Sequence, residues 1–595
     1  MKSLGAKFAE IVQAIGSFFK SAALLTLRFV ADFIFRLIDL VLPLIKIAHF
    51  VRNKLPGFWN WLTRQDWFKR LISRRTFRKF AGAAPARPHQ FTMAQDYTTW
   101  YGFVDRSYTG RHLPPRRASN LPDPDALTNL FLRDETDGQT DCTRSTVLFA
   151  AFAQWFTDSF LRTAHAMEFD AKNNVIRDGS DAIIRKEGRA TRNTSNHEID
   201  LCQIYGLTQD QTNLLRCDDD ENRGCLKFQD GEDGEYPCFL LSGKPTALDP
   251  KDPKKNGQLR IRREFKNLHP DERIIRSIFS KAGHNKKGYE TIFAVGLEHG
   301  NATIGNSLMN TIFLREHNRI ARLIAGQHTD WDSDRVFETT RNVMTVLLLK
   351  IVISDYIRHI SPMNLPLEFQ PGLAEKENWY RTNRISIEFN LLYRWHALVP
   401  DEMSFMPNPK DPVAFLHNND WLMQTGVGKA VDLFSKEVAG RITLGNTPRF
   451  LGPVKRDTIS LMRDANLATY NAYRERFSLP KAHSYEDITD DKNMISELKA
   501  LYGENVDNLE WYVGLMAEKH GTDMIMGDLL LTMVAHDAFT QALTNPLLAN
   551  EVFRPETFSP VGWKVINETS KLEHIVQRVV GGAEPVTCTF SHATR

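Results

Sequence analysis

The 595-residue sequence lacks the motifs that mark the common classes of hydrolase and nucleotide-binding enzyme. It contains no H-E-x-x-H, G-x-S-x-G or Walker A sequence, and TGVGKA at 425–430 lacks the loop length to cradle a phosphate. It has six cysteines, none before Cys142 and none in a C-x-x-C pair, so neither a zinc knuckle nor a disulfide-dense module is indicated. Pairing between some of the six stays open.

Alternating strand patterns are nearly absent, and the sequence has no internal repeat or low-complexity tract. From about residue 142 onward helical periodicity dominates, with apolar residues recurring at i, i+3, i+4 and i+7 in segments 144–163, 308–326 and 332–360. A polar stretch at 216–270 is predicted as loop. The chain exceeds the ~250–300 residues of a single core, which indicates one unusually large helical domain or a main domain with appendages.

The first 80 residues lack an uninterrupted apolar run long enough to cross a bilayer, because charged residues interrupt every window of about 20 residues. Arg28, Asp32 and Arg36 fall at i, i+4 and i+8 and form one polar stripe on an otherwise apolar helix, which is typical of a helix lying in a membrane interface. The alternative is a helical hairpin packed on the protein's own core. A secretory signal fits poorly, since charges run through the apolar region and no small-residue cleavage site follows.

Charge separates this segment from the rest of the chain. Residues 1–90 carry sixteen Lys/Arg and four Asp/Glu, whereas the remainder has a net charge of −9. A basic end of this kind is expected to meet an anionic surface, and its many apolar residues favour lipid over nucleic acid. We therefore predict amphipathic membrane-binding helices over 1–80, a Pro/Arg-rich connection over 81–125 and a helical domain over 126–595. We expect the protein to associate with a membrane peripherally. The sequence pattern favours neither face of the membrane.

Histidines, tyrosines and acids on helices do not by themselves identify a function. The segment IEFNLLYRWHALVPDEM at 387–403 nevertheless resembles the proximal haem segment of the prostaglandin endoperoxide synthases, in the peroxidase–cyclooxygenase superfamily. NTIFLREHNRIARLI at 310–324 and GKAVDLFSKEVAGRI at 428–442 are similar to segments of that family in the same order. The resemblance covers roughly residues 90–590 and lacks the family's growth-factor-like module. It implies a mainly α, large single helical haem-peroxidase-like domain.

The resemblance also implies a set of roles near the haem. His396 would be the proximal ligand of the iron of haem b, and Tyr393 would be the residue oxidised to a radical. That radical would remove hydrogen from an unsaturated fatty acid, to which O₂ then adds. Tyr356 falls where the family has a tyrosine that supports the radical residue, and Asn390 falls in the surroundings of the haem.

The sequence departs from the family on the distal side of the haem. The family places Gln and His one helical turn apart there; this chain has Gln154 but Asp158 in the histidine position. His299 is a candidate for a further distal polar group. Because aspartate is ordinarily a weaker base than histidine, we hypothesise a poor peroxidase that remains a competent dioxygenase.

The substrate channel departs as well. Ala538 stands where the family has the serine that aspirin acetylates, and Met363 stands where it has a tyrosine at the channel mouth. Arg74, Arg75 and Arg78 lie in the stretch where the family has the arginine that binds the fatty-acid carboxylate, and Arg78 is the candidate. A basic face that contacts lipid headgroups is the favoured alternative for these residues.

Three functions follow from these patterns. A cyclooxygenase-like fatty-acid dioxygenase with weak peroxidase activity explains Tyr393, His396 and the membrane segment together. The alternatives are a haem peroxidase acting on small reductants or halides, and a degenerate haem-binding protein. We expect no nucleic-acid partner. Monomer and homodimer both remain alternatives for the oligomeric state.

Overall fold

The computed structural model describes residues 44–84, 109–115, 121–136, 138–163, 168–169, 175–176, 193–242, 261–269, 291–380, 384–408, 411, 414–521, 523–580 and 585–592. Contacts within the chain divide it into two compact units, Met1–Leu71 and Ile72–Arg595. The predicted stripe of Arg28, Asp32 and Arg36 lies outside the described residues. The expected boundaries near residues 80 and 125 remain predictions.

The first unit consists, in its described part, of short helices that expose large apolar side chains. They are α3 (Leu44–Lys54), α4 (Pro56–Leu62) and the beginning of α5 (Asp66–Ala81). Phe50, Leu55, Phe58 and Trp61 are between 36% and 49% exposed, and the rings of Phe58 and Trp61 stack with centroids 5.7 Å apart. None of the helices formed by the described residues is both long and apolar enough to cross a membrane.

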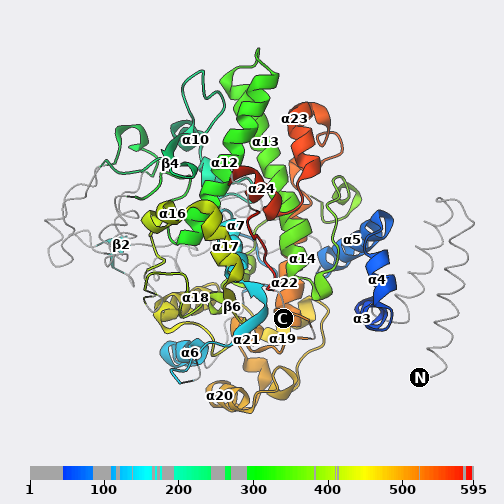
Figure 1. The fold of residues 1–595 in the computed structure, drawn as a ribbon. Coiled ribbons are helices and arrows are strands. Elements are labelled where there is room, and N and C mark those ends of the chain that lie inside the picture. The colour runs from blue at the N-terminus through cyan, green and yellow to red at the C-terminus, as the bar shows by residue number, and fades with distance from the viewer. Residues whose placement is uncertain are drawn as a thin grey trace, which may run out of the picture. The chain divides into compact units, whose positions relative to one another are not determined.

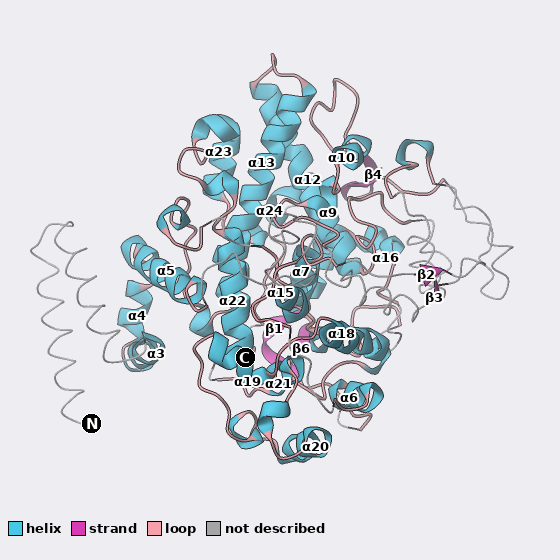
Figure 2. Cartoon of the chain, turned by 180° about the vertical axis from the view of Figure 1, so that it is seen from behind, coloured by secondary structure: helices cyan, strands magenta, loops and turns pink. Residues whose placement is uncertain are grey.

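The second unit is built mainly from helices, as the helical periodicity predicted (Figures 1 and 2). In its first half these are α6 (Pro124–Phe131), α7 (Val147–Thr157), α9 (Cys202–Tyr205), α10 (Gln209–Leu215), α12 (Ile304–Gln327), α13 (Ser333–Ile351) and α14 (Ile357–Ile360). In its second half they are α15 (Ile387–Leu392), α16 (Asn419–Thr425), α17 (Val427–Lys436), α18 (Gly452–Asp464), α19 (Tyr470–Arg476), α20 (Lys492–Tyr502), α21 (Trp511–Ala517), α22 (Asp528–Ala542), α23 (Pro555–Glu568) and α24 (Leu572–Val579). Short 3-10 turns lie at Arg263–Phe265, Pro362–Asn364, Ala374–Lys376, His396–Leu398, Arg449–Leu451, Tyr485–Asp487, Val506–Asn508 and Pro546–Leu548.

The helix α12 runs through the core of this unit and packs against α7, α13 and α24. Its residues from Ile304 to Asn318 are buried without interruption. The helix begins where the hydroxyl of Thr303 accepts a hydrogen bond from the backbone N–H of Asn306, an N-cap that satisfies one of the free amides of the first turn. A helix that is buried on every side can carry polar side chains only where they form hydrogen bonds. A buried side-chain amide on α12 therefore indicates a hydrogen-bond partner on a neighbouring element.

Three two-stranded sheets complete the unit. β1 (Asp141–Thr146) pairs antiparallel with β6 (Val438–Gly440), which ties the start of α7 to the end of α17. β2 (Glu168–Phe169) pairs with β3 (Val175–Ile176). β4 (Phe228–Gly231) and β5 (Gly234–Pro237) form a hairpin in the stretch predicted as loop. The difference arises because Gly231 and Gly234 flank a two-residue turn, where Gly234 adopts a φ of +128°.

All six cysteines lie among the described residues, and all are free thiols. Cys142, Cys202 and Cys225 are buried, whereas Cys217, Cys238 and Cys588 are partly accessible. The pairing that the sequence left open is therefore not part of this fold, and hydrophobic packing and hydrogen bonds hold the unit together.

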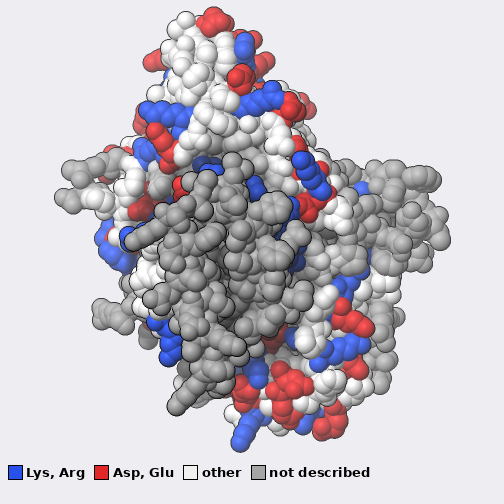
Figure 3. Space-filling model, turned by 90° about the vertical axis from the view of Figure 1, so that its right-hand side faces the viewer, with Lys and Arg blue, Asp and Glu red and all other residues white. Residues whose placement is uncertain are grey.

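One face of the molecule can be read for charge in Figure 3. Lys/Arg and Asp/Glu side chains are interspersed over its described residues, and white uncharged surface separates them. Over these residues neither sign forms a continuous strip. Nucleic-acid binding depends on such a basic strip, so this face gives no electrostatic reason to revise the predicted partners.

Candidate functional site

The predicted radical tyrosine and iron ligand lie together at the end of α15. This helix starts where the hydroxyl of Ser386 accepts a hydrogen bond from the backbone N–H of Phe389, and it ends at Leu392. Tyr393 is the residue that caps the helix, and His396 opens the 3-10 turn His396–Leu398. Because only two residues separate Tyr393 from His396, both side chains extend from the same short stretch of backbone between the helix and the 3-10 turn.

The imidazole of His396 has the properties of a haem ligand. Its Nδ1 is buried and has no hydrogen-bond partner. Burial holds the pKa of His396 well below its ordinary value, and the positive charges of Lys455 and Arg394 add to this shift. A neutral imidazole is the form that binds iron, so the residues present fit a haem whose iron is bound by His396.

Tyr393 and Tyr356 are two buried phenols whose hydroxyls influence each other. Burial raises the pKa of Tyr393 well above its ordinary value; the neighbouring hydroxyl of Tyr356 opposes this shift and the carboxylate of Asp537 increases it. Both hydroxyl oxygens are buried, and each phenol influences the pKa of the other. Both groups therefore stay protonated near neutral pH. The supporting role of Tyr356 remains a prediction.

A local irregularity of the backbone places Tyr356. The helix α13 continues into the π-helical turn Val352–Tyr356 before α14 begins. Such turns insert one extra residue and are frequent at functional sites, because they rotate the following side chains relative to a regular helix. The turn ends at Tyr356, whose ring lies 5.3 Å from that of Phe149.

Aromatic contacts connect this pair to α7. Phe149 stacks on Tyr356 at 5.3 Å and lies 6.3 Å from Trp395, while Trp395 lies 4.7 Å from Tyr393. Phe152 contacts Tyr356 from the next turn of α7 at 5.5 Å. These rings form a packed wall between α7, Tyr356 and the Tyr393–His396 segment, which limits how far either tyrosine can move.

The helix α7 carries a stripe of accessible residues. Ala150 and Gln154 are one helical turn apart, Asp158 follows one turn further, and all three are at least partly accessible. The residues between them are buried. A stripe of this kind on a buried helix marks a face that does not pack on protein; the distal role of Gln154 and Asp158 remains a prediction.

Asp158 differs from an ordinary surface aspartate. Its Oδ2 accepts a 2.9 Å hydrogen bond from the side-chain amide of Asn306 on α12. Burial raises the pKa of Asp158 to about 6, against the opposing effects of Asn306, Arg162 and Arg394. Since Arg394 lies two residues before His396, its effect on Asp158 connects the stripe on α7 to the Tyr393–His396 segment.

Two of the remaining haem-side candidates have different surroundings. Asn390 is fully buried and accepts a 2.8 Å hydrogen bond from Arg394 through its Oδ1. His299 is half-buried in the turn before α12. Burial lowers the pKa of His269 and of His417, and the charge of His299 adds to both shifts. The role of His299 over the haem remains a prediction.

The channel candidates also come from separate elements. Ala538 is buried on α22, and Met363 lies in the turn Pro362–Asn364 with its side chain outside the described part. The Nε of Arg78 donates a 2.8 Å hydrogen bond to Glu377, and the Arg78 side chain is 59% exposed. A carboxylate binding to Arg78 would compete with Glu377 for the guanidinium.

Three residues that shape the electrostatics of this site were not singled out from the sequence. Arg394 was visible as the residue between Tyr393 and His396, but nothing in the pattern gave it a role. Lys455 is fully buried with its Nζ 2.7 Å from the hydroxyl of Tyr512, and burial lowers its pKa to about 7. Asn306 could have been recognised by one feature, a polar side-chain amide on a helix whose apolar periodicity predicts burial.

A mainly helical domain with a neutral His396, whose buried Nδ1 has no hydrogen-bond partner, fits a haem protein of the peroxidase class. The model of the animal haem peroxidase family matches residues 167–588, and the chain belongs to this family. It is accordingly a haem-dependent oxidoreductase.

Known proteins with similarity to the chain fall into two groups. The chain is 29% identical to mouse prostaglandin G/H synthase 2 over 564 residues, which cover 92% of this chain and 83% of the relative. It is 30% identical to rat prostaglandin G/H synthase 1 over 551 residues, covering 90% and 81%. Among solved structures it resembles the Oryza sativa fatty acid alpha-dioxygenase, with a TM-score of 0.62 and 16% identity, covering 91% of this chain and 95% of that one. Peroxidase A of Dictyostelium discoideum follows with a TM-score of 0.58 and 18% identity, covering 84% and 99%.

Proposed function

We propose that this protein is a cyclooxygenase-like, haem-dependent fatty-acid dioxygenase that adds O₂ to an unsaturated fatty acid through a radical on Tyr393. The observation that carries the proposal is the pairing of Tyr393, whose hydroxyl is buried near that of Tyr356, with the neutral His396 three residues later. The similarity to prostaglandin G/H synthases over most of both chains supports it.

Haem bound at His396 would supply the one-electron oxidation that converts Tyr393 to its radical. Haem b, held without covalent attachment, is the form we propose, because the sequence has no C-x-x-C-H segment. Asn390 would contribute to the same side of the haem by fixing the Arg394 guanidinium.

The chain's own groups then carry the reaction on the substrate. As Tyr393 loses an electron, its phenolic proton leaves, and the nearby hydroxyl of Tyr356 stabilises the oxygen that remains. The phenoxyl oxygen takes a hydrogen atom from a bis-allylic carbon of the fatty acid, which restores the phenol. O₂ adds to the carbon radical, and the resulting peroxyl takes a hydrogen atom from Tyr393, which gives a hydroperoxide and regenerates the Tyr393 radical. If the peroxyl first closes a ring, a second O₂ adds to the new carbon radical before the same hydrogen transfer, and the product is an endoperoxide that carries a hydroperoxide.

A peroxidase acting on small reductants is the second candidate, and Asp158 is the observation that favours it. With a pKa of about 6, Asp158 is ionised at neutral pH yet basic enough to accept a proton from a peroxide. Gln154, one turn away, would orient the peroxide by hydrogen bonding. We propose that this activity is the weaker of the two, because the short aspartate side chain is already engaged by Asn306.

Membrane association is proposed for the first unit and would bring the protein to its substrate. Phe50, Leu55, Phe58 and Trp61 expose apolar area on neighbouring helices, with basic residues at the end of α3. In the second unit a cavity of about 540 Å³ lies at the C-terminal end of α5, lined by Ala81–Ala84 and Arg476 among others. We propose this cavity as the entry for the fatty acid, with the basic Arg476 of its lining near the carboxylate. A homodimer remains an open prediction.

The proposal is tested with haem-loaded protein and oleate, linoleate or arachidonate, by measuring O₂ uptake and identifying products by mass spectrometry. Tyr393→Phe should keep the haem spectrum and lose oxygenation, whereas His396→Ala should lose both haem and all activity. A Tyr393→Phe protein that oxygenates fatty acid at the full rate would refute the radical assignment. If the Tyr393→Phe protein keeps peroxide-dependent oxidation and the wild type oxygenates none of the three acids, the protein is a peroxidase.

A further inference from the structure

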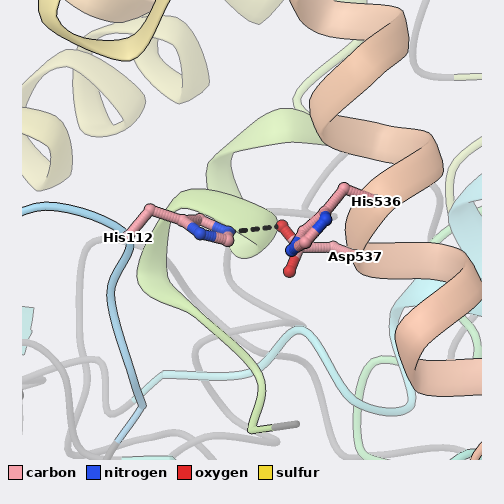
Figure 4. Close-up of side chains that lie close together, drawn as sticks. All are labelled: His112, His536 and Asp537. Atoms are coloured by element: carbon pink, nitrogen blue, oxygen red, sulfur yellow. Dashed lines mark hydrogen bonds and ion pairs between the residues drawn. The ribbon is translucent and has the colours of Figure 1, made fainter. Parts of the chain in front are cut away.

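A compact group of three potential metal ligands lies on α22 and on the segment that faces it. The ligand atoms of His112, His536 and Asp537 all lie within 4.8 Å of one another, and all three residues are buried. Figure 4 shows His112 directed toward Asp537, while His536 and Asp537 extend from consecutive positions of α22. Among the residues that the structure describes, this is the one such group of three or more His, Cys, Asp or Glu side chains.

The orientation of His536 is fixed by a hydrogen bond made away from the group. Its Nδ1 lies 3.0 Å from the carbonyl oxygen of Phe80. Because a carbonyl can only accept, Nδ1 carries the proton and the lone pair of the neutral ring is on Nε2. Histidines that bind metals are commonly held in this way, by donating the other ring nitrogen to a backbone carbonyl.

His112 is held equally firmly, through its backbone. Gly110 bridges to Ser386, with the N–H of Gly110 donating to Ile385 and the N–H of Ile387 donating to the carbonyl of Gly110. The N–H of His112 donates a 2.9 Å hydrogen bond to Glu388 on α15. Ligands placed on rigid elements in this way need little rearrangement to meet at one point.

The distances suit a small divalent ion. His112 Nε2 and Asp537 Oδ2 are 2.9 Å apart. Ligands bound at about 2.0–2.1 Å in a tetrahedral site are about 3.3 Å from one another, so an ion replacing the proton shared by this pair would require a shift of a few tenths of an ångström. The rings of His112 and His536 are 5.4 Å apart at their centroids, which lets both nitrogens reach the same point.

The surroundings supply a reason for a cation there. The carboxylate of Asp537 is 1% exposed and the side chain of His112 is fully buried. The ring of Phe477 packs against both histidines, at 5.0 Å from His112 and 5.5 Å from His536. The pair of His112 and Asp537 is therefore shielded from water, and two imidazoles with one carboxylate are a donor set that Zn²⁺ and related ions accept.

We propose that His112, His536 and Asp537 form a second metal site, separate from the haem iron, that binds one divalent transition-metal ion of the Zn²⁺ type. Three protein ligands leave a fourth position for water or another small ligand. The site adjoins the channel candidate Ala538, which follows Asp537 on α22. A cation bound there would offset the negative charge that Asp537 presents to Tyr393.

The proposal is tested on the untagged full-length haem-loaded protein, equilibrated with Zn²⁺ and then dialysed against metal-free buffer. We expect about one zinc per chain by elemental analysis, in addition to the haem iron. Asp537→Asn and His536→Phe should reduce bound zinc by on the order of tenfold or more while haem absorbance is retained. His317→Gln is the matched control, because His317 is an equally buried histidine that is engaged by Tyr205 and the carbonyl of Gly224; it should keep its zinc.

X-ray absorption at the zinc edge of the wild-type protein provides a second measurement that does not depend on the variants folding. Two imidazoles and a carboxylate oxygen are expected around the metal. A shell containing sulfur would place the zinc at the cysteines and overturn the proposal. Wild-type protein without stoichiometric zinc, or equal zinc in the wild type and both cluster variants, would overturn it as well.

Discussion

The side-chain amide of Asn306 donates a 2.9 Å hydrogen bond to Oδ2 of Asp158, joining α12 to the distal stripe of α7. The two residues are 148 positions apart in the sequence. This bond opposes the effect of burial on the Asp158 carboxyl, whose pKa is nevertheless raised to about 6. The acid–base behaviour of the distal side is therefore set by a balance between desolvation and one amide.

That balance predicts a pH dependence of the peroxidase activity. Asp158 can accept a proton only when ionised, so peroxide-dependent oxidation of a small reductant should fall as the pH drops through about 6. Asn306→Ala removes a contact that lowers the pKa, so the midpoint should move to higher pH by roughly one unit. Thr311→Ala, which removes a hydroxyl bonded to Ser307 of its own helix, is the control. A midpoint that is unchanged in Asn306→Ala would show that Asp158 does not set it.

The same pKa changes the reason for expecting a weak peroxidase. With a pKa of about 6, the carboxylate of Asp158 is nearly as basic as a histidine. The weak peroxidase activity is therefore expected from the short side chain of Asp158 and not from low basicity. Asp158→Glu adds one methylene and should raise the peroxidase rate on the order of tenfold, part of the ~10²–10⁴ that a positioned base contributes. Asp158→His should raise it too.

Asp158→Asn is the control for this series, since it keeps the size and removes the base. Its peroxidase rate should fall below that of the wild type, as measured by peroxide-dependent oxidation at fixed haem content. Lower activity in the Glu and His variants would mean that Asp158 already acts at its best distance.

Tyr356 is predicted to assist Tyr393 without being required for it. Tyr356→Phe keeps the ring that packs on Phe149 and removes the hydroxyl that opposes the raised pKa of Tyr393. O₂ uptake should fall about 2- to 10-fold, the equivalent of one hydrogen bond of about 0.5–1.5 kcal/mol, with an unchanged haem spectrum. Tyr205→Phe, which removes another buried hydroxyl that bonds His317, should leave O₂ uptake unaffected. Equal losses in both variants would indicate general destabilisation.

The helical architecture was predictable because it depends on local sequence, and periodicity predicted α12 and α13. The roles of Tyr393 and His396 came from the family resemblance and remain predictions. The β4–β5 hairpin was missed, since a two-residue turn between glycines has no apolar period to reveal it.

The electrostatic partners were not predictable, because they meet across the fold. Asn306 reaches Asp158 and Asp537 influences Tyr393 only after α7, α12, α15 and α22 have packed. The π-helical turn that ends at Tyr356 has no sequence signature either, since the same residues would suit a regular helix.

The last prediction concerns the membrane and refines where the anchoring segment can be cut. The second unit begins at Ile72, and within it Phe77 is fully buried against Phe539 while the hydroxyl of Ser73 accepts a 2.7 Å hydrogen bond from the N–H of Glu368. Removing residues 1–65 should therefore abolish vesicle binding and preserve haem, whereas a deletion through residue 80 should also destabilise the haem domain. Co-sedimentation with phospholipid vesicles and thermal unfolding distinguish the two.

Point substitutions make the same test without a deletion. Phe58→Ser with Trp61→Ser removes two exposed aromatic rings, each worth about 1.5–3 kcal/mol when buried, so vesicle binding should weaken by on the order of 100-fold. Leu323→Ser with Val454→Ser is the matched control, because these side chains are similarly exposed, at 43% and 39%, but lie in the second unit. Equal loss of vesicle binding in the two double variants would contradict an anchor in the first unit, and unchanged binding in both would show that neither surface meets the lipid.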